Sequence, residues 1–244
     1  MNKEPKVFNE HDLLRKEDGL IYNKDGFLFT GTYFGSSGSG FPSGILKAEY
    51  KNGLKDGRQE EFNSEEELEK ITNYKKGKLQ GPYKIYFNKK LYEKGAYKDG
   101  KEDGPRKTYE RNGKLHQIYT YKNGELNGPN ELYYRGKKLW TSVNYECGRK
   151  HGIEEYYDFD GNLEHRQTYK NGEQRGLQEY YYENGQLESS QNHTGDDTGT
   201  EEEYFDNGQL KSKYIWEAEG CGILLESYDK SGRALIKRPR RIDD

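Results

Sequence analysis

A tyrosine-to-glycine tetrad recurs along the chain at intervals of 23 or 24 residues. The copies are Tyr50-Lys-Asn-Gly, Tyr74-Lys-Lys-Gly, Tyr97-Lys-Asp-Gly, Tyr121-Lys-Asn-Gly, Tyr145-Glu-Cys-Gly and Tyr169-Lys-Asn-Gly. A second glycine follows the first by four residues in each of these copies. A period this regular is the signature of a tandem repeat protein, in which each repeat packs mainly against its neighbours.

Each repeat continues with an aromatic residue, then a turn signal, then a leucine. The aromatic residues are Phe62, Tyr86, Tyr109, Tyr133, Tyr157, Tyr181 and Tyr204, and the leucines are Leu68, Leu91, Leu115, Leu139, Leu163, Leu187 and Leu210. The best-formed turns contain Asn112-Gly113, Asp160-Gly161, Asn184-Gly185 and Asn207-Gly208, which are strong hairpin signals. Connections this short join antiparallel neighbours. The sequence therefore predicts an all-β fold, an elongated and twisted antiparallel β-meander of tandem hairpin repeats of about 24 residues.

The repeat period divides the chain into four segments. We expect residues 1–17 to form an N-terminal cap, 18–49 an atypical first repeat with a Gly/Ser insertion at Gly35 to Gly40, 50–216 seven tandem repeats, and 217–244 a degenerate C-terminal cap with a basic tail. Caps are expected because a terminal repeat must end the sheet without leaving an open edge.

Composition agrees with an exposed sheet rather than with a large aliphatic core. The chain contains 23 Tyr and 30 Gly, residues that suit strands and tight turns. Its 40 basic and 43 acidic residues leave a net charge of only -3, whereas disordered chains usually combine low hydrophobicity with a high net charge. The composition therefore favours a folded repeat array.

Several functional classes lack the sequence features that they require. No apolar run approaches the roughly 20 residues of a membrane-spanning helix, and no leader-like segment opens the chain, so we expect a cytoplasmic protein without a membrane span. Cys147 and Cys221 lie in no paired motif, and we expect two free thiols. The mixture of acidic with basic residues argues against nucleic-acid binding.

Motifs for catalysis are also missing. The five histidines, His11, His116, His151, His165 and His193, occupy no common repeat position and no metal-ligand spacing. No nucleophile elbow or phosphate-binding loop is present. We therefore expect no enzymatic activity, no metal and no cofactor, although a carboxylate pair of the hydrolase type stays open because carboxylates are abundant.

The repeat, Tyr-Lys-Asn-Gly-x-x-x-Gly followed by two aromatic residues and Asn-Gly-x-Leu, resembles the MORN-repeat variant of bacterial YwqK-type antitoxins. The resemblance covers roughly residues 18 to 215 and includes the opening Asp18-Gly-Leu-Ile-Tyr22. It implies an antitoxin or immunity protein that binds a cognate toxin, the product of a neighbouring gene, and that is a monomer when free. Three departures are the turn before Leu91, which lacks Gly, the repeat at Gly195, which lacks its leading Tyr, and the Gly/Ser insertion.

Positions that vary between repeats are candidates for partner binding, because the constant positions serve the scaffold. Strand alternation places Leu139 with Thr141, Val143 and Tyr145, and Trp140 on the other face. If the constant aromatics and leucines share one face, the opposite face carries the variable residues. The predicted partner-binding residues are Phe87, Tyr92, Ile118, Tyr134, Trp140, Tyr156 and Tyr182. Whether they share a face depends on turn length, which the sequence leaves open.

Two alternatives to an aromatic interface also remain open. The aromatic residues could simply cover the second side of a thin sheet. The acidic runs Glu65 to Glu67, Asp196-Asp197 and Glu201 to Glu203 could dock a basic toxin cleft or be solvated surface. A competing function is that of a membrane-associated MORN scaffold, which would bind anionic lipid through lysine-rich turns and the basic tail.

Overall fold

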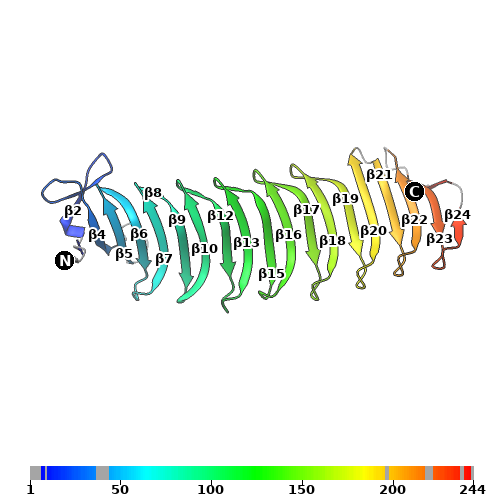
Figure 1. The fold of residues 1–244 in the computed structure, drawn as a ribbon, viewed down its shortest axis with the longest axis horizontal. Helices are drawn as coiled ribbons and strands as arrows, with labels where there is room; N and C mark the ends of the chain where they lie inside the picture. The colour runs from blue at the N-terminus through cyan, green and yellow to red at the C-terminus, as the bar shows by residue number, and fades with distance from the viewer. Residues whose placement is uncertain are drawn as a thin grey trace. The chain divides into compact units, whose positions relative to one another are not determined.

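The computed structural model describes residues 7–8, 10–36, 44–195, 198–217, 222–236 and 239–242. Among these residues the only helical element is the short 3-10 turn η1 (Glu10–Asp12), and strands make up most of the rest. The chain divides into two compact halves, Met1–Glu125 and Leu126–Asp244, which are described separately below. Within each half most of the described strands form an antiparallel meander of hairpins, as the sequence predicts, and near the N-terminus two short strands, Leu13–Arg15 and Ile21–Asn23, form a separate antiparallel pair (Figure 1).

The N-terminal half begins with a short parallel strand pairing. Its strands are β1 (Val7–Phe8), β2 (Leu13–Arg15), β3 (Ile21–Asn23), β4 (Gly31–Ser36), β5 (Ile45–Lys51), β6 (Leu54–Phe62), β7 (Leu68–Lys75), β8 (Lys78–Leu79), β9 (Gly81–Phe87), β10 (Lys90–Lys98), β11 (Lys101–Glu102), β12 (Gly104–Tyr109) and β13 (Leu115–Lys122). Strand β1 pairs in parallel with β4, and the rings of Phe8 and Phe29 meet edge to face at 5.0 Å. From β4 onward each hairpin pairs antiparallel with the next. Strand β1 thus covers part of β4 where the meander starts.

The C-terminal half continues the same pattern to its last strand. Its strands are β15 (Gly128–Tyr134), β16 (Lys138–Glu146), β17 (Arg149–Tyr157), β18 (Leu163–Lys170), β19 (Glu173–Tyr181), β20 (Leu187–Gly195), β21 (Thr198–Tyr204), β22 (Leu210–Trp216), β23 (Gly222–Tyr228), β24 (Ala234–Ile236) and β25 (Arg240–Ile242), and β14 (Glu125–Leu126) spans the boundary between the halves. Strands β24 and β25 both pair with β23. Part of the expected basic tail is therefore a strand of the sheet.

Each of the four predicted segments falls partly outside the described residues, which in the N-terminal cap leave out residues 1–6 and 9. Gly35 and Ser36 end β4 and pair with Leu46 and Ile45, whereas the rest of the Gly/Ser insertion, from residue 37, is not described. Cys221 and residues 237–238 of the basic tail also lie outside the described residues. The structure therefore does not address the free thiol predicted at Cys221.

Two kinds of turn connect the strands. Between repeats the turn has two residues, both at positive φ, as at Asn123 (φ 53) and Gly124 (φ 88). The Gly124 N–H donates to the Glu102 carbonyl of the preceding strand segment at 2.8 Å. Within a repeat the turn is commonly one residue longer, with only its last residue at positive φ, as at Gly113 (φ 83). The three-residue turn between β15 and β16 differs, because Arg135 (φ 51) and Gly136 (φ 64) both lie at positive φ. The structure thus settles the turn length that the sequence left open.

The turn between β9 and β10 is an exception to this rule. Phe87 pairs directly with Lys90, so that the turn contains only Asn88 (φ 48) and Lys89 (φ 63). The deleted residue accounts for the single 23-residue interval in the sequence, between Tyr74 and Tyr97. Asn88 and Lys89 therefore both adopt a backbone conformation that glycine adopts at lower cost.

A β-bulge in the second strand of each repeat corrects the predicted sorting of faces. Tyr133 pairs with Leu139 and Leu132 pairs with Thr141, so Trp140 is the extra residue. Leu139 therefore lies on the face opposite Thr141, and the simple alternation that placed them together is wrong. We call the face with the constant aromatic–leucine pairs the leucine face. The opposite face, which carries the leading tyrosines of the tetrads, is the tyrosine face.

The tyrosine face holds a polar rather than an aliphatic core. Tyr83 is 2% exposed, and its hydroxyl donates to Glu93 at 2.9 Å and to Glu102 at 3.0 Å. In the C-terminal half Glu154 is 4% exposed and accepts hydrogen bonds from Lys150 and Gln167 at 2.6 and 2.8 Å. Because buried charges are stable only when they are paired, these networks are part of the scaffold.

Candidate protein-binding surface

The bulges display one unpaired and exposed residue per repeat. These residues are Glu69, Tyr92, His116, Trp140, Glu164, Glu188, Lys211 and Leu235. Tyr92 is 50% exposed and Trp140 is 47% exposed. Large aromatic side chains that stay this exposed are typical of the centres of protein interfaces. Two of the seven predicted residues therefore occupy positions where the scaffold leaves the side chain free.

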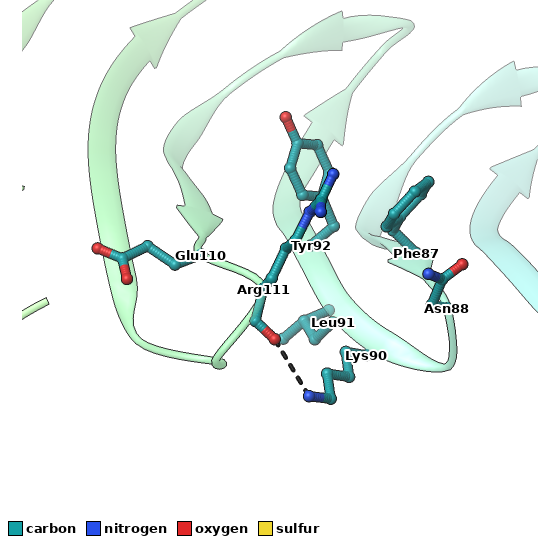
Figure 2. A pocket seen from close by; sticks show the side chains of 7 residues that line it. All are labelled: Phe87, Asn88, Lys90, Leu91, Tyr92, Glu110 and Arg111. Carbon is teal, nitrogen blue, oxygen red and sulfur yellow. Dashed lines mark hydrogen bonds between the residues drawn. The ribbon is translucent and has the colours of Figure 1, made fainter. Parts of the chain in front are cut away.

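A hollow of about 220 Å³ lies beside Tyr92 in the N-terminal half. It is lined by Phe87, Asn88, Lys90, Leu91, Tyr92, Glu110 and Arg111. Figure 2 shows Arg111 rising beside Tyr92, whereas the carboxylate of Glu110 points away from it. The Lys90 ammonium donates to the Arg111 carbonyl at 3.2 Å and so ties two successive turns together. The hollow is smaller than the roughly 300 Å³ at which small-molecule sites begin, and it suits a single inserted side chain.

The same positions are also aromatic in the C-terminal half. Tyr134 and Trp140 are the counterparts of Phe87 and Tyr92 in their repeat. Phe159, from the next turn, packs edge to face on Tyr134 with ring centroids 5.1 Å apart. Phe159 is itself 71% exposed, and its carbonyl accepts a hydrogen bond from Lys138 at 2.8 Å. The Tyr134–Phe159 pair thus presents an aromatic knob, and Trp140 of the same hairpin as Tyr134 is exposed.

The other three predicted residues do not join these surfaces. Ile118 lies on the leucine face, in the same strand as Leu115, contrary to the predicted arrangement. Tyr156 lies on the tyrosine face and stacks on His165 at 4.1 Å. Tyr182 donates its hydroxyl to the Tyr204 carbonyl at 2.8 Å. The structure therefore does not bring the seven residues together on one face.

Sequence reasoning missed Arg111 and Lys90, which complete the wall of the hollow. Arg111 comes from the turn of the following repeat, and the comparison of strand positions between repeats does not include turn residues. The one signal that could have found this place is the 23-residue interval, because it marks the repeat whose turn is shorter.

One of the three acidic runs, Glu201 to Glu203, is engaged within the sheet, whereas in the run Glu65 to Glu67 only Glu67 forms an ion pair within the described part of the chain, with Lys89. Glu202 contacts Lys213 at 2.7 Å, and Glu203 accepts from Ser212 at 2.7 Å. Glu201 accepts a hydrogen bond from the Trp216 indole N–H at 2.9 Å. Asp196 and Asp197 lie outside the described residues. The run at Glu201 to Glu203 is therefore tied to neighbouring strands rather than left free to dock a partner.

Hydrogen-bonded pairs also fix the protonation of several side chains. Burial alone would raise the pKa of Glu154, but hydrogen bonds from Lys150 and Gln167 outweigh it and lower the pKa below its usual value. Burial and the hydrogen bond to Glu131 raise the pKa of Tyr133 to about 12. The carboxylate of Glu154 thus stays ionised, and the tyrosine stays neutral, across the physiological range.

Two further observations concern ligands and membranes. Within the described residues no group of three or more His, Cys, Asp or Glu side chains is arranged to hold a metal ion. None of the helices in that part of the chain is long and apolar enough to cross a membrane. Cys147, at an inter-repeat turn, is exposed as a free thiol.

The geometry defines an open array of β-hairpin repeats with exposed turn-edge side chains. Four segments, residues 102–123, 150–171, 174–194 and 197–217, match the MORN repeat variant. MORN repeats are modules that bind proteins or lipids. Comparison with curated proteins finds no match. Phe87, Tyr92, Tyr134 and Trp140 lie outside the four matched segments, whereas Arg111 and Phe159, from the turns that follow, lie within two of them.

Proposed function

We propose that this chain is a non-catalytic, protein-binding repeat protein that acts as an antitoxin or immunity protein in the cytoplasm. It binds a cognate toxin as a monomer and covers the active site of that toxin. The observation that carries the proposal is the pair of exposed aromatic sites at equivalent places, the hollow at Phe87 and Tyr92 and the knob of Tyr134 and Phe159 with the exposed Trp140. A handful of aromatic anchors commonly supplies most of the affinity of a protein interface.

The arrangement suits recognition of a folded protein. The hollow can accept one side chain of the partner, and the aromatic knob can enter a depression on the partner's surface. A small ligand would need only a concave site. The scaffold holds both in place, because each turn is hydrogen-bonded to the next through Lys90 or Lys138. Preorganised anchors of this kind lose little side-chain entropy on binding.

Co-expression with the product of the neighbouring gene tests the proposal. We expect that product to arrest growth alone and to be harmless when this chain is present. Phe87→Ala and Trp140→Ala should each weaken the purified complex by about 30-fold or more, which corresponds to a hot spot of about 2 kcal/mol. Glu164→Ala is the matched control, because Glu164 occupies the bulge position equivalent to Trp140 and is also exposed. A neighbouring product that is harmless with and without this chain would contradict the antitoxin role.

A second function is favoured by a separate observation. A hollow of about 400 Å³ at the inter-repeat turns of the N-terminal half is lined by Lys75, Lys76, Lys78, Gln80, Lys98 and Asp99. Four lysines around one depression are suited to anionic lipid headgroups. Flotation with phosphatidylserine vesicles tests this role, and binding that persists in a K75Q/K78Q/K98Q variant would remove the lysine hollow as its cause.

A further inference from the structure

Three lysines lie in register on the leucine face of the N-terminal half. Lys84 in β9 pairs with Lys94 in β10, and Lys94 pairs with Lys107 in β12. The residues that continue this row on either side are Ile71 and Ile118. Like charges directly opposite one another across a sheet are destabilising, so the scaffold does not explain this arrangement.

No carboxylate within the described residues makes a salt bridge to any of the three lysines. The Lys94 ammonium lies over the Tyr109 ring, 5.5 Å from its centroid, and an aromatic face compensates only part of a charge. The equivalent row of the C-terminal half alternates in sign. There Glu155 pairs in register with Arg166, which pairs with Glu179 and forms an ion pair with it.

We propose that the row Lys84, Lys94 and Lys107 binds an acidic segment of the protein partner. This inference rests on the proposed function and names the chemistry of the partner at one place. Carboxylates laid over the row would supply the negative charges that the C-terminal half provides for itself. Charge complementarity of this kind also raises the association rate and fixes the register of a complex.

The surroundings of the row favour a polypeptide over a phosphate backbone or a lipid headgroup. Half-buried isoleucines, Ile71 and Ile118, end the row on both sides. Along β10, Lys94 lies three residues from Leu91, which lines the aromatic hollow. A segment with acidic side chains over the lysines and an apolar side chain in the hollow would satisfy both surfaces, and polypeptides carry both groups.

Binding of labelled N-acetyl-hexaglutamate, measured by fluorescence anisotropy at low salt, tests the row without the toxin. At about 10 mM salt the Debye length is roughly 30 Å, so a weak electrostatic contact is measurable. We expect K84Q/K94Q/K107Q to weaken binding by at least about tenfold. The matched control, K51Q/K122Q/K170Q, removes the same charge at three exposed lysines that lie in neither hollow and should change affinity by less than about twofold.

Three outcomes would overturn the inference. Equal losses in the two triple variants would show that the peptide senses only net charge. Binding of oligodeoxythymidylate or phosphatidylserine vesicles that depends on the row, with no binding of hexaglutamate, would assign another occupant. Full toxin neutralisation by K84Q/K94Q/K107Q, at unchanged affinity for the toxin, would reject the acidic contact and leave the proposed antitoxin function standing.

Discussion

The repeat that contains Phe87 and the repeat that contains Tyr134 use equivalent positions in opposite ways. In both, a lysine near the turn donates a hydrogen bond to a carbonyl of the next turn, at 3.2 Å in the first case and 2.8 Å in the second. The residue that supplies that carbonyl is Arg111 in the N-terminal half and Phe159 in the C-terminal half. Phe159 packs on Tyr134, whereas Arg111 leaves a hollow beside Phe87. The two sites thus differ in this side chain and in the length of their own turn, which has two residues after Phe87 and three after Tyr134.

The leucine faces of the two halves also differ in the side chains that stand at equivalent positions. The C-terminal row places Arg166 between Glu155 and Glu179, whereas Lys94 stands between two further lysines. Backbone pairing is the same in both rows, so the hairpin scaffold tolerates either charge pattern. The contrast shows that the sheet fixes the places where side chains stand and leaves their chemistry free to specialise.

Reversing the charge at Arg166 should have the largest effect on stability. Arg166→Glu would place three carboxylates in a row and leave Glu179, which is 9% exposed, without its partner. Because Arg166 itself is 37% exposed, solvent reduces the cost, and we expect a loss of about 2–3 kcal/mol in the free energy of unfolding. Urea denaturation measures it. Arg175→Glu, at an exposed arginine of the next strand, should cost under about 0.5 kcal/mol, and an equal loss in both variants would contradict the role of the row.

Filling the hollow should have the next largest effect, on partner binding. Arg111→Phe places a ring where Phe159 stands in the C-terminal half, and we expect it to weaken the complex by about 2 kcal/mol while stability is kept. Titration calorimetry with the purified partner measures the change. Phe159→Ala is the comparison, because it removes a ring without closing a hollow. Unchanged affinity in Arg111→Phe would show that the partner does not enter the hollow.

Replacing the second residue of the short turn should stabilise the N-terminal half. Lys89 lies at φ 63, where glycine is favoured, so Lys89→Gly should raise the free energy of unfolding by about 0.5–1 kcal/mol. The exposed Lys89–Glu67 ion pair, at 2.7 Å, is lost in this variant and offsets part of the gain. Thermal unfolding measures the net change. Glu66→Gly, at φ 61 in a three-residue turn, should gain a similar amount, and losses in both variants would refute the strain.

The sequence predicted the repeat architecture because its signals are local. The paired glycines and the short turns determine which strands are neighbours, and a 24-residue period requires no long-range information. Whether the constant aromatics and leucines share a face was left open by the sequence, and the pairing of Tyr133 with Leu139 shows that they do.

The surface could not be predicted with the same accuracy. A β-bulge leaves no residue signature that distinguishes Trp140 from an ordinary strand position, and one extra residue reverses the face of Leu139. Similarly, the lysine row depends on the register between strands, because Lys84, Lys94 and Lys107 are unremarkable until they stand opposite one another. Cross-strand register therefore limits what sequence alone reveals about such a sheet.

Alternating the charges in the lysine row should have a smaller effect on stability. Whether stability rises or falls tests whether the lysines repel one another. Lys94→Glu places a carboxylate between Lys84 and Lys107 and reproduces the pattern at Arg166 with opposite signs. We expect a gain of about 0.5 kcal/mol in stability, together with loss of hexaglutamate binding. Lys94→Gln separates the two effects, because it removes repulsion without adding attraction. A decrease in stability in Lys94→Glu would show that the row is not repulsive.

The smallest expected effect concerns the residue two positions before each constant tyrosine. The C-terminal half has a carboxylate at this position, whereas the N-terminal half has a lysine, such as Lys84 before Tyr86. In the C-terminal half Tyr133 donates to Glu131 at 2.6 Å, and burial with this bond raises the pKa of Tyr133 to about 12. The folded pKa therefore exceeds the unfolded value of about 10, so this contribution to stability is complete below pH 10 and is lost as pH rises toward 12.

Glu131→Gln should lower the pKa of Tyr133 and change stability at pH 7 by only a few tenths of a kcal/mol. Titration of ¹³Cζ-labelled tyrosine by NMR reports the shift, with Glu164→Gln as the control. A midpoint for Tyr133 that is the same in both variants would mean that burial alone sets its pKa.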